Sequence, residues 1–127
     1  MVSTSFAIIF LLSVLLHYAH GVECVKAKFY EAEPNFYFFT RKLKTIPESV
    51  YFVFHGSFWL FILLAFFLLL GGRWIFIPLC LYGLLFLTEG HHFIKAAQRK
   101  KYYPGAITSV LFPILGVLYW FQLISMW

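Results

Sequence analysis

The sequence has little charge, because it contains no aspartate and charged residues make up only 12% of its 127 residues. Soluble domains carry about 25% charged residues and are about 45–50% apolar. This chain is 62% hydrophobic and includes 17 phenylalanines. The composition therefore excludes an ordinary soluble domain and predicts a single membrane domain over residues 1–127.

Cysteine is also scarce, and its scarcity excludes a disulfide framework. Cys24 and Cys80 both lie in apolar stretches, where single cysteines usually behave as small hydrophobic residues. The net charge of +5 does not indicate a nucleic-acid partner, because the basic residues lie where they would flank membrane spans. The expected surroundings are a lipid bilayer.

Four apolar segments are long enough to cross a bilayer, which takes roughly 20 helical residues. They cover residues 6–25, 50–70, 74–97 and 106–127. The connection at residues 71–73, Gly-Gly-Arg, is so short that the second and third helices should be antiparallel neighbours. The first segment lacks a positively charged n-region, which favours a retained helix over a cleaved signal peptide. We predict an all-α, membrane-spanning four-helix bundle.

The longest connection, residues 26–49, combines clustered aromatic residues with Arg41, Lys42 and Lys44. It fits either a short amphipathic segment in the headgroup region or an irregular polar loop. Every lysine and arginine except Arg73 lies in the first and third connections or the adjoining helix ends. The positive-inside rule then predicts cytoplasmic basic loops and both termini outside.

Ionisable residues inside the apolar spans are the main functional signal, since each costs about 2.5–3.5 kcal/mol at mid-bilayer on insertion scales. From the helical rise, His20, Glu89 and His55 fall at one depth, roughly 21–22 Å from the outer boundary. His20 and Glu23 are three residues apart, as are Glu89 and His92. Each pair therefore shares one helix face.

This spacing predicts a metal site. Glu-x-x-His motifs that project into a helical bundle form carboxylate-bridged di-iron and di-manganese sites. Imidazole with carboxylate suits zinc, iron, copper or manganese. The predicted ligands share the cytoplasmic half of the spans: His20, Glu23, His55, Glu89 and His92.

Other residues near these ligands are assigned supporting roles: His17, Cys24, His91, Tyr102 and Tyr103. Several alternatives stay open. His17 and His91 also fit interfacial histidines, and either glutamate fits a structural pair with a histidine or Lys95. His55 also fits a satisfied core histidine, and paired histidines fit b-type haem ligation.

The chain resembles the HXXEE family of small integral membrane proteins. His20-Gly21-Val22-Glu23 matches the first four positions of the His-x-x-Glu-Glu motif, with Cys24 in place of the second glutamate. His92 is similar to the family's separate histidine, and Tyr102-Tyr103-Pro104-Gly105 matches Tyr-x-Pro-Gly. The resemblance implies candidate residues and no reaction. A soft thiolate at Cys24 favours zinc or copper over a di-iron centre.

The predicted function is an intramembrane site for one or two transition-metal ions, namely zinc, iron or copper. If the protein is an enzyme, an oxidoreductase or a hydrolase, the metal would act on a lipid or other hydrophobic substrate, with Glu89 carrying protons. The alternative is a non-catalytic accessory subunit of a larger membrane complex, or a homo-oligomer. A haem protein is a weaker alternative, because haem needs no intramembrane glutamates and the sequence has no Cys-x-x-Cys-His. An ion-handling protein is also weaker, because the outer halves of the spans hold almost no polar residues.

Overall fold

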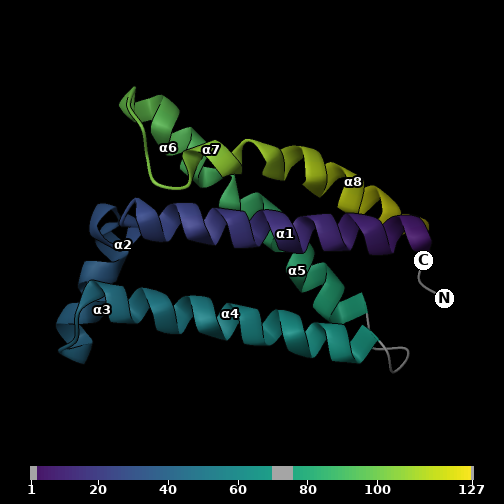
Figure 1. Ribbon diagram of the computed structural model, residues 1–127, viewed down its shortest axis with the longest axis horizontal. Coiled ribbons are helices and arrows are strands. Elements are labelled where there is room, and N and C mark those ends of the chain that lie inside the picture. Colours follow the sequence, from purple (N-terminus) through teal and green to yellow (C-terminus); the bar gives the residue numbers. More distant parts are fainter. Residues whose placement is uncertain (1–2, 70–75, 127) are drawn as a thin grey trace.

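The computed structural model describes residues 3–69 and 76–126, and these residues fold into helices with no strand among them. The all-α prediction is confirmed. In chain order the helices are α1 (Thr4–Lys26), α2 (Phe29–Ala32), α3 (Pro34–Leu43), α4 (Pro47–Leu69), α5 (Phe76–Glu89), α6 (His91–Arg99), α7 (Ala106–Ser109) and α8 (Leu111–Ser125) (Figure 1). The predicted Gly-Gly-Arg turn at 71–73 lies outside the described residues.

Three stretches of the described chain are long and apolar enough to cross a membrane. They are α1, the continuous run of α5 and α6 from Phe76 to Arg99, and the run of α7 and α8 from Ala106 to Ser125. These match the first, third and fourth predicted spans to within a few residues. Helix α4 is 23 residues long and covers the second predicted span from residue 50 to residue 69, and the end of that span at residue 70 is not described.

The helix ends follow from local chemistry. Ser3 caps α1 by accepting a hydrogen bond from the Phe6 backbone N–H at 3.1 Å. Lys28, Lys44 and Lys100 all have positive φ angles near 50°, and the latter two directly follow α3 and α6. A left-handed residue just after a helix ends it and turns the chain.

Helix α8 packs against both α1 and α5, and their buried aromatic side chains form a shared core. Small residues let the helices approach, which is how helices associate within a bilayer. A Cβ atom on Gly83 of α5 would lie 2.6 Å from the ring of Trp120 on α8. The indole N–H of Trp120 donates to the Gly83 carbonyl at 3.2 Å, so this contact is both packed and hydrogen-bonded.

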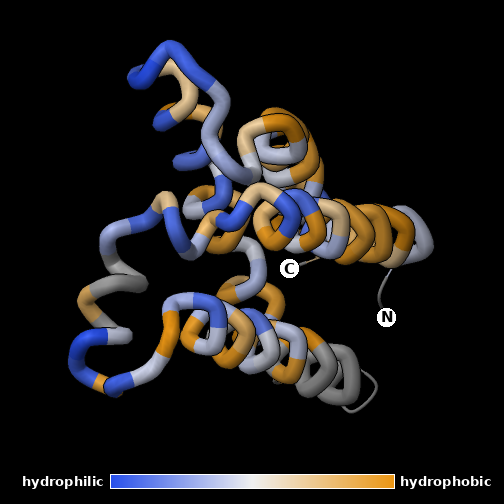
Figure 2. Tube along the Cα trace, turned by 60° about the vertical axis from the view of Figure 1, so that its left-hand side comes forward, coloured by the Kyte–Doolittle hydropathy of each residue, from blue (hydrophilic) through white to orange (hydrophobic). Residues whose placement is uncertain are grey.

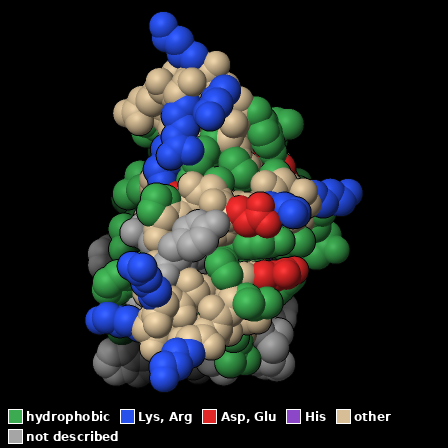
Figure 3. Space-filling model, turned by 90° about the vertical axis from the view of Figure 1, so that its left-hand side faces the viewer, with side chains coloured by type: hydrophobic (Ala, Val, Ile, Leu, Met, Phe, Trp, Pro, Cys, Tyr) green, Lys and Arg blue, Asp and Glu red, His purple; other side chains and the backbone are tan. Residues whose placement is uncertain are grey.

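Both termini lie at one end of the molecule, and α2, α3 and the α6–α7 connection lie at the other (Figure 1). The helices are mostly hydrophobic along their length, whereas the connections at this second end are hydrophilic (Figure 2). Lysine and arginine side chains gather on that end face (Figure 3). The segment at residues 26–49 is helical in α2 and α3, so the irregular-loop alternative is wrong.

Candidate metal centre

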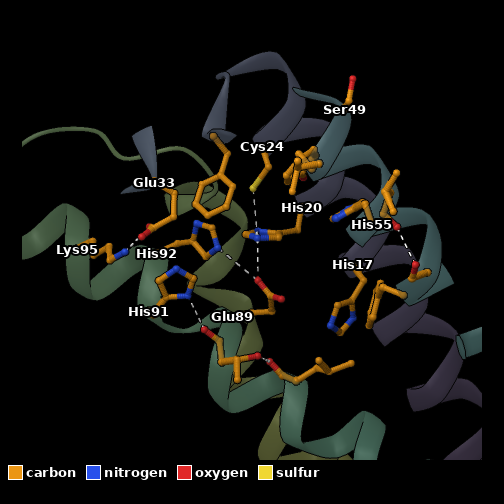
Figure 4. A pocket seen from close by; sticks show the side chains of 18 of the residues that line it. His17, His20, Cys24, Glu33, Ser49, His55, Glu89, His91, His92 and Lys95 are labelled. Atoms are coloured by element: carbon orange, nitrogen blue, oxygen red, sulfur yellow. Dashed lines mark hydrogen bonds and ion pairs between the residues drawn. The ribbon is translucent and has the colours of Figure 1, made fainter. Parts of the chain in front are cut away.

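Four potential ligands converge near the end of the bundle that carries α2 and α3 (Figure 4). His20 and Cys24 come from α1, Glu89 is the last residue of α5, and His92 lies in the first turn of α6. His20 Nε2 lies 3.0 Å from Glu89 Oε2, and His92 Nε2 lies 3.4 Å from the same oxygen. Cys24 Sγ lies 3.4 Å from His20 Nε2.

Helix geometry explains why these side chains meet. His20 and Cys24 are four residues apart on α1, and Glu89 and His92 are three apart, so each pair lies on one face. Gly90, between Glu89 and His92, keeps helical backbone angles (φ −60°, ψ −19°). The face of α5 therefore continues into α6 without a sharp bend.

The donor atoms of the two histidines and the cysteine form a group with the dimensions of a metal site. Cys24 Sγ, a ring nitrogen of His20 and a ring nitrogen of His92 all lie within 4.8 Å of one another. The three side chains are buried, each with 3% or less of its surface exposed. Glu89 is 24% exposed at its side chain and lines the adjacent cavity.

A relay of hydrogen bonds fixes the proton of His20. Its Nδ1 lies 2.7 Å from the Thr108 hydroxyl, and that hydroxyl donates its own proton to Glu23 Oε2 at 2.7 Å. The hydroxyl has one proton to give, so it accepts from His20 Nδ1–H. Nδ1 of His20 therefore carries a proton, and its Nε2 faces Glu89 Oε2 and Cys24 Sγ.

His92 is held in the same way by the Tyr-Tyr-Pro-Gly segment. Its Nδ1–H donates to the Pro104 carbonyl at 2.6 Å, so Nε2 is the ring nitrogen that faces Glu89. The Nε2 atoms of both imidazoles thus point at one carboxylate oxygen of Glu89. Three acceptors meet in this manner when positive charge lies between them, either as a metal ion or as protons on the imidazoles.

Glu23 supports this arrangement from outside the group, in contrast to the ligand role predicted from its spacing. Its carboxylate accepts hydrogen bonds from the Tyr102 hydroxyl at 2.9 Å and from the Ile107 and Thr108 backbone N–H groups at 3.1 and 2.9 Å. With the Thr108 hydroxyl added, both oxygens are occupied. Glu23 therefore anchors the start of α7 to α1 and orients His20 through Thr108.

Gly105 forms the wall behind the ligands. Its φ of +84° is in the left-handed region that favours glycine. A Cβ atom there would lie 2.5 Å from His20 Cε1, 2.7 Å from His92 Nδ1 and 2.8 Å from Cys24 Sγ. Both the turn and the close approach of the ligands thus require glycine at this position of the Tyr-x-Pro-Gly match.

His17 and His55 lie beside the group and line a cavity of about 830 Å³ with it (Figure 4). His55 packs against Gly21 of α1, where a Cβ atom would lie 2.5 Å from its Nε2. The structure therefore does not bring His55 into the convergent group, although it places it in the same cavity. Half-exposed His91 donates from Nδ1 to the Thr88 carbonyl at 2.6 Å.

A second polar cluster joins α2, α3 and α6 and is separate from the candidate ligands. The buried carboxylate of Glu33 accepts hydrogen bonds from Lys95 and from the Tyr103 hydroxyl. Burial acts to raise the pKa of the Glu33 carboxyl, but these two hydrogen bonds outweigh it, so the pKa lies below its usual range. Lys95 forms an ion pair with Glu33. The open alternative that Lys95 pairs with Glu23 or Glu89 is therefore wrong.

Two residues of these networks had no place in the sequence-based site, Thr108 and Glu33. Thr108 carries a weak signal, a hydroxyl three residues after a Pro-Gly turn at the start of an apolar span. Glu33 precedes a proline in an aromatic-rich connection and resembles an ordinary loop glutamate. Sequence spacing does not reveal these contacts, because Thr108 lies 85 residues from Glu23 and Glu33 lies 62 residues from Lys95.

Comparison with known proteins found no match to a family model, a curated protein or a solved structure. Interpretation of the site therefore depends on its geometry.

Proposed function

We propose that this protein is an integral membrane protein that binds a transition-metal ion through His20, Cys24, Glu89 and His92. All four helices, α1, α4, α5–α6 and α7–α8, would cross the bilayer. The basic end face and the metal site would lie on the cytoplasmic side, with both termini outside.

The observation that carries the proposal is the orientation of the two histidines. Metal-ligating histidines usually donate their second ring N–H to a carbonyl, a carboxylate or a hydroxyl, which fixes the tautomer and aims the lone pair. His20 does so to Thr108 and His92 to Pro104. Their two Nε2 atoms then face one oxygen of Glu89, an arrangement that a bound cation would complete.

The donor set fits zinc best. Two imidazoles, one thiolate and one carboxylate make a mixed nitrogen, sulfur and oxygen set of the kind that zinc binds in tetrahedral geometry. Copper is also compatible with the soft thiolate, and iron with the imidazoles and the carboxylate. Replacement of the second glutamate of His-x-x-Glu-Glu by Cys24 is consistent with this order.

A bound metal would act as a Lewis acid toward a substrate oxygen or lower the pKa of a bound water. The chain's own residues would position it: Thr108 and Glu23 hold His20, and Pro104 holds His92. Glu89 faces the cavity and would carry a proton between the site and a hydrophobic substrate. The protein would then be a metal-dependent hydrolase or oxidoreductase that acts on lipid-soluble molecules.

Elemental mass spectrometry on the purified protein tests the proposal. The wild type should contain near-stoichiometric zinc, copper or iron, and a His20→Ala, Glu89→Ala double variant should contain background amounts. His91→Ala is the matched control, because His91 neighbours His92 in sequence but bonds only to its own helix, and it should keep the metal. Background metal in the folded wild type would mean that the cluster is a hydrogen-bonded packing device.

A further inference from the structure

The cavity beside the candidate metal centre has the size of a small-molecule site, since such pockets span about 300–1,000 Å³ and this one measures about 830 Å³. Its wall is mostly apolar and comes from α1, α4, α5 and α6, with one residue each from α2 and α3. Leu43 and Val53 line it and are 64% and 71% exposed. The cavity therefore opens to the exterior past apolar side chains, where a bilayer would supply ligands.

Deep in this cavity, His17 carries a polar atom without a partner. Its Nδ1 lies 2.8 Å from the Ser13 carbonyl, which can only accept, so the ring proton is on Nδ1. Tyr82 adds a contact to Nδ1 at 3.0 Å. Nε2 is thus a bare acceptor, and this buried atom has no hydrogen-bond partner among the described residues.

His55 borders the cavity on the opposite helix, α4, and its buried Nε2 likewise lacks a hydrogen-bond partner within the described chain. His17, His55 and Glu89 all border the same space (Figure 4). His17 is 3% exposed, so bulk water does not satisfy its nitrogen. Buried polar atoms in native proteins are nearly always paired, so a molecule bound in the cavity would satisfy an orphan atom at its wall.

From these atoms we infer that the cavity binds a single-chain lipid alcohol, whose hydroxyl donates to His17 Nε2 and whose alkyl chain fills the apolar remainder. The inference rests on the proposed function, because it names the substrate class of the same site. It can nevertheless be tested without a bound metal.

The charges around the cavity favour a hydroxyl over other head groups. A carboxylate has no proton to donate to His17 and would face the carboxylate of Glu89. An ammonium group could donate, but Lys95 lines the same cavity, and a metal at His20 and His92 would add positive charge. A neutral hydroxyl meets an acceptor without these repulsions.

Photolabelling with a straight-chain alkanol that carries a diazirine tests the inference. Purified wild-type protein is labelled in nanodiscs, the modified residues are mapped by mass spectrometry, and dodecanol, dodecyl methyl ether and dodecane compete. We expect labels on the α4 wall of the cavity, at Val53 or Phe58. Dodecanol should compete at least about fivefold better than the ether, since only the alcohol donates a hydrogen bond.

His17→Phe should abolish the preference for alcohol over ether and leave the metal content unchanged. The competitor series uses the wild type alone, so it decides the matter even if this variant misfolds. Equal competition by all three compounds, or labels confined to lipid-facing positions such as Leu118, would overturn the inference. Alcohol-selective labelling of a metal-free wild type would instead refute the proposed function and keep the inference.

Discussion

The half of the molecule near the termini and the half near α2 differ in how their buried polar atoms are paired. In the half near the termini, the buried hydroxyls that the structure describes have partners: the Tyr119 hydroxyl donates to the Leu79 carbonyl at 2.8 Å, and Tyr82 contacts the Ser13 hydroxyl at 2.9 Å. In the half near α2, the Nε2 atoms of His20 and His92 both face one carboxylate oxygen of Glu89. The contacts in the first half need no added charge, whereas those in the second need positive charge, from imidazole protons or from the proposed metal ion.

This difference separates packing from binding. Polar groups that lock helices together in a bilayer satisfy one another, because an unsatisfied group is costly there. Two imidazoles that face one carboxylate need positive charge between them, and the proposed metal ion would supply it. Variants in the half near the termini should therefore change stability alone. Variants around the candidate ligands should change metal content as well.

The largest expected effect is at Gly105. Gly105→Ala places a side chain on a left-handed residue, which costs about 1–2 kcal/mol, and adds collisions with His20, His92 and Cys24. We expect background metal content and a lower unfolding temperature. Gly56→Ala is the control, since nothing lies within 4 Å of a Cβ there. A Gly105→Ala protein with full metal content would show that the ligands do not require glycine at this position.

Thr108→Val sharpens the comparison by breaking the relay without changing side-chain shape. The His20 tautomer would no longer be fixed, and loss of such outer contacts lowers metal affinity about 10–100-fold. Competition against a chelator measures this affinity. Thr88→Val is the matched control, because the Thr88 hydroxyl donates only to its own helix at Leu85. Equal metal affinities in the two variants would show that Thr108 does not support metal binding through His20.

Glu33 allows a pH test that is independent of the metal. Because hydrogen bonds lower its pKa in the folded protein, Glu33 stabilises the fold above the ordinary carboxyl pKa, and this stabilisation is lost as the pH falls through the lowered pKa. Glu33→Gln should destabilise the protein by about 1–2 kcal/mol at neutral pH and weaken the acid-side dependence of its unfolding temperature.

The control for this experiment is Glu48→Gln, at an exposed position in the first turn of α4. It should keep the acid-side dependence of the wild type. Identical pH profiles for Glu33→Gln and the wild type would show that the cluster with Lys95 and Tyr103 contributes nothing to stability. Metal content at neutral pH should be the same in all three proteins.

Tyr119→Phe probes the other half and should have the smallest effect. It removes one buried hydrogen bond, to Leu79, and should lower the free energy of unfolding by about 1 kcal/mol. Metal content should not change. A loss of metal in this variant would mean that the two halves are coupled and that the comparison fails.

Hydropathy was enough to predict the helices, because a bilayer leaves few ways to satisfy a backbone. The helical rise was enough to bring His20 and Glu89 to one level. Both inferences depend on distances along a single helix, which sequence determines. The spans therefore agree with α1, α5–α6 and α7–α8 to within a few residues.

The roles of individual side chains could not be predicted in the same way. Glu23 has ligand spacing from His20, yet its carboxylate meets Thr108 instead, because α7 packs against α1. Cys24, assigned a supporting role, belongs to the convergent group, and His55 packs on Gly21. Each outcome depends on how one helix is rotated about its axis against another, which residue spacing does not fix.

The candidate ligands are synthesised at different times. His20 and Cys24 leave the ribosome early, whereas His92 is made much later and the Thr108 contact later still. Until the last helix is made, the first helix carries an imidazole, a thiol and the Glu23 carboxylate with no partners from the C-terminal third. In the proposed metalloprotein, metal loading would consequently be a final step of biogenesis, and a chain interrupted before residue 108 would leave these groups exposed to other metals and oxidants.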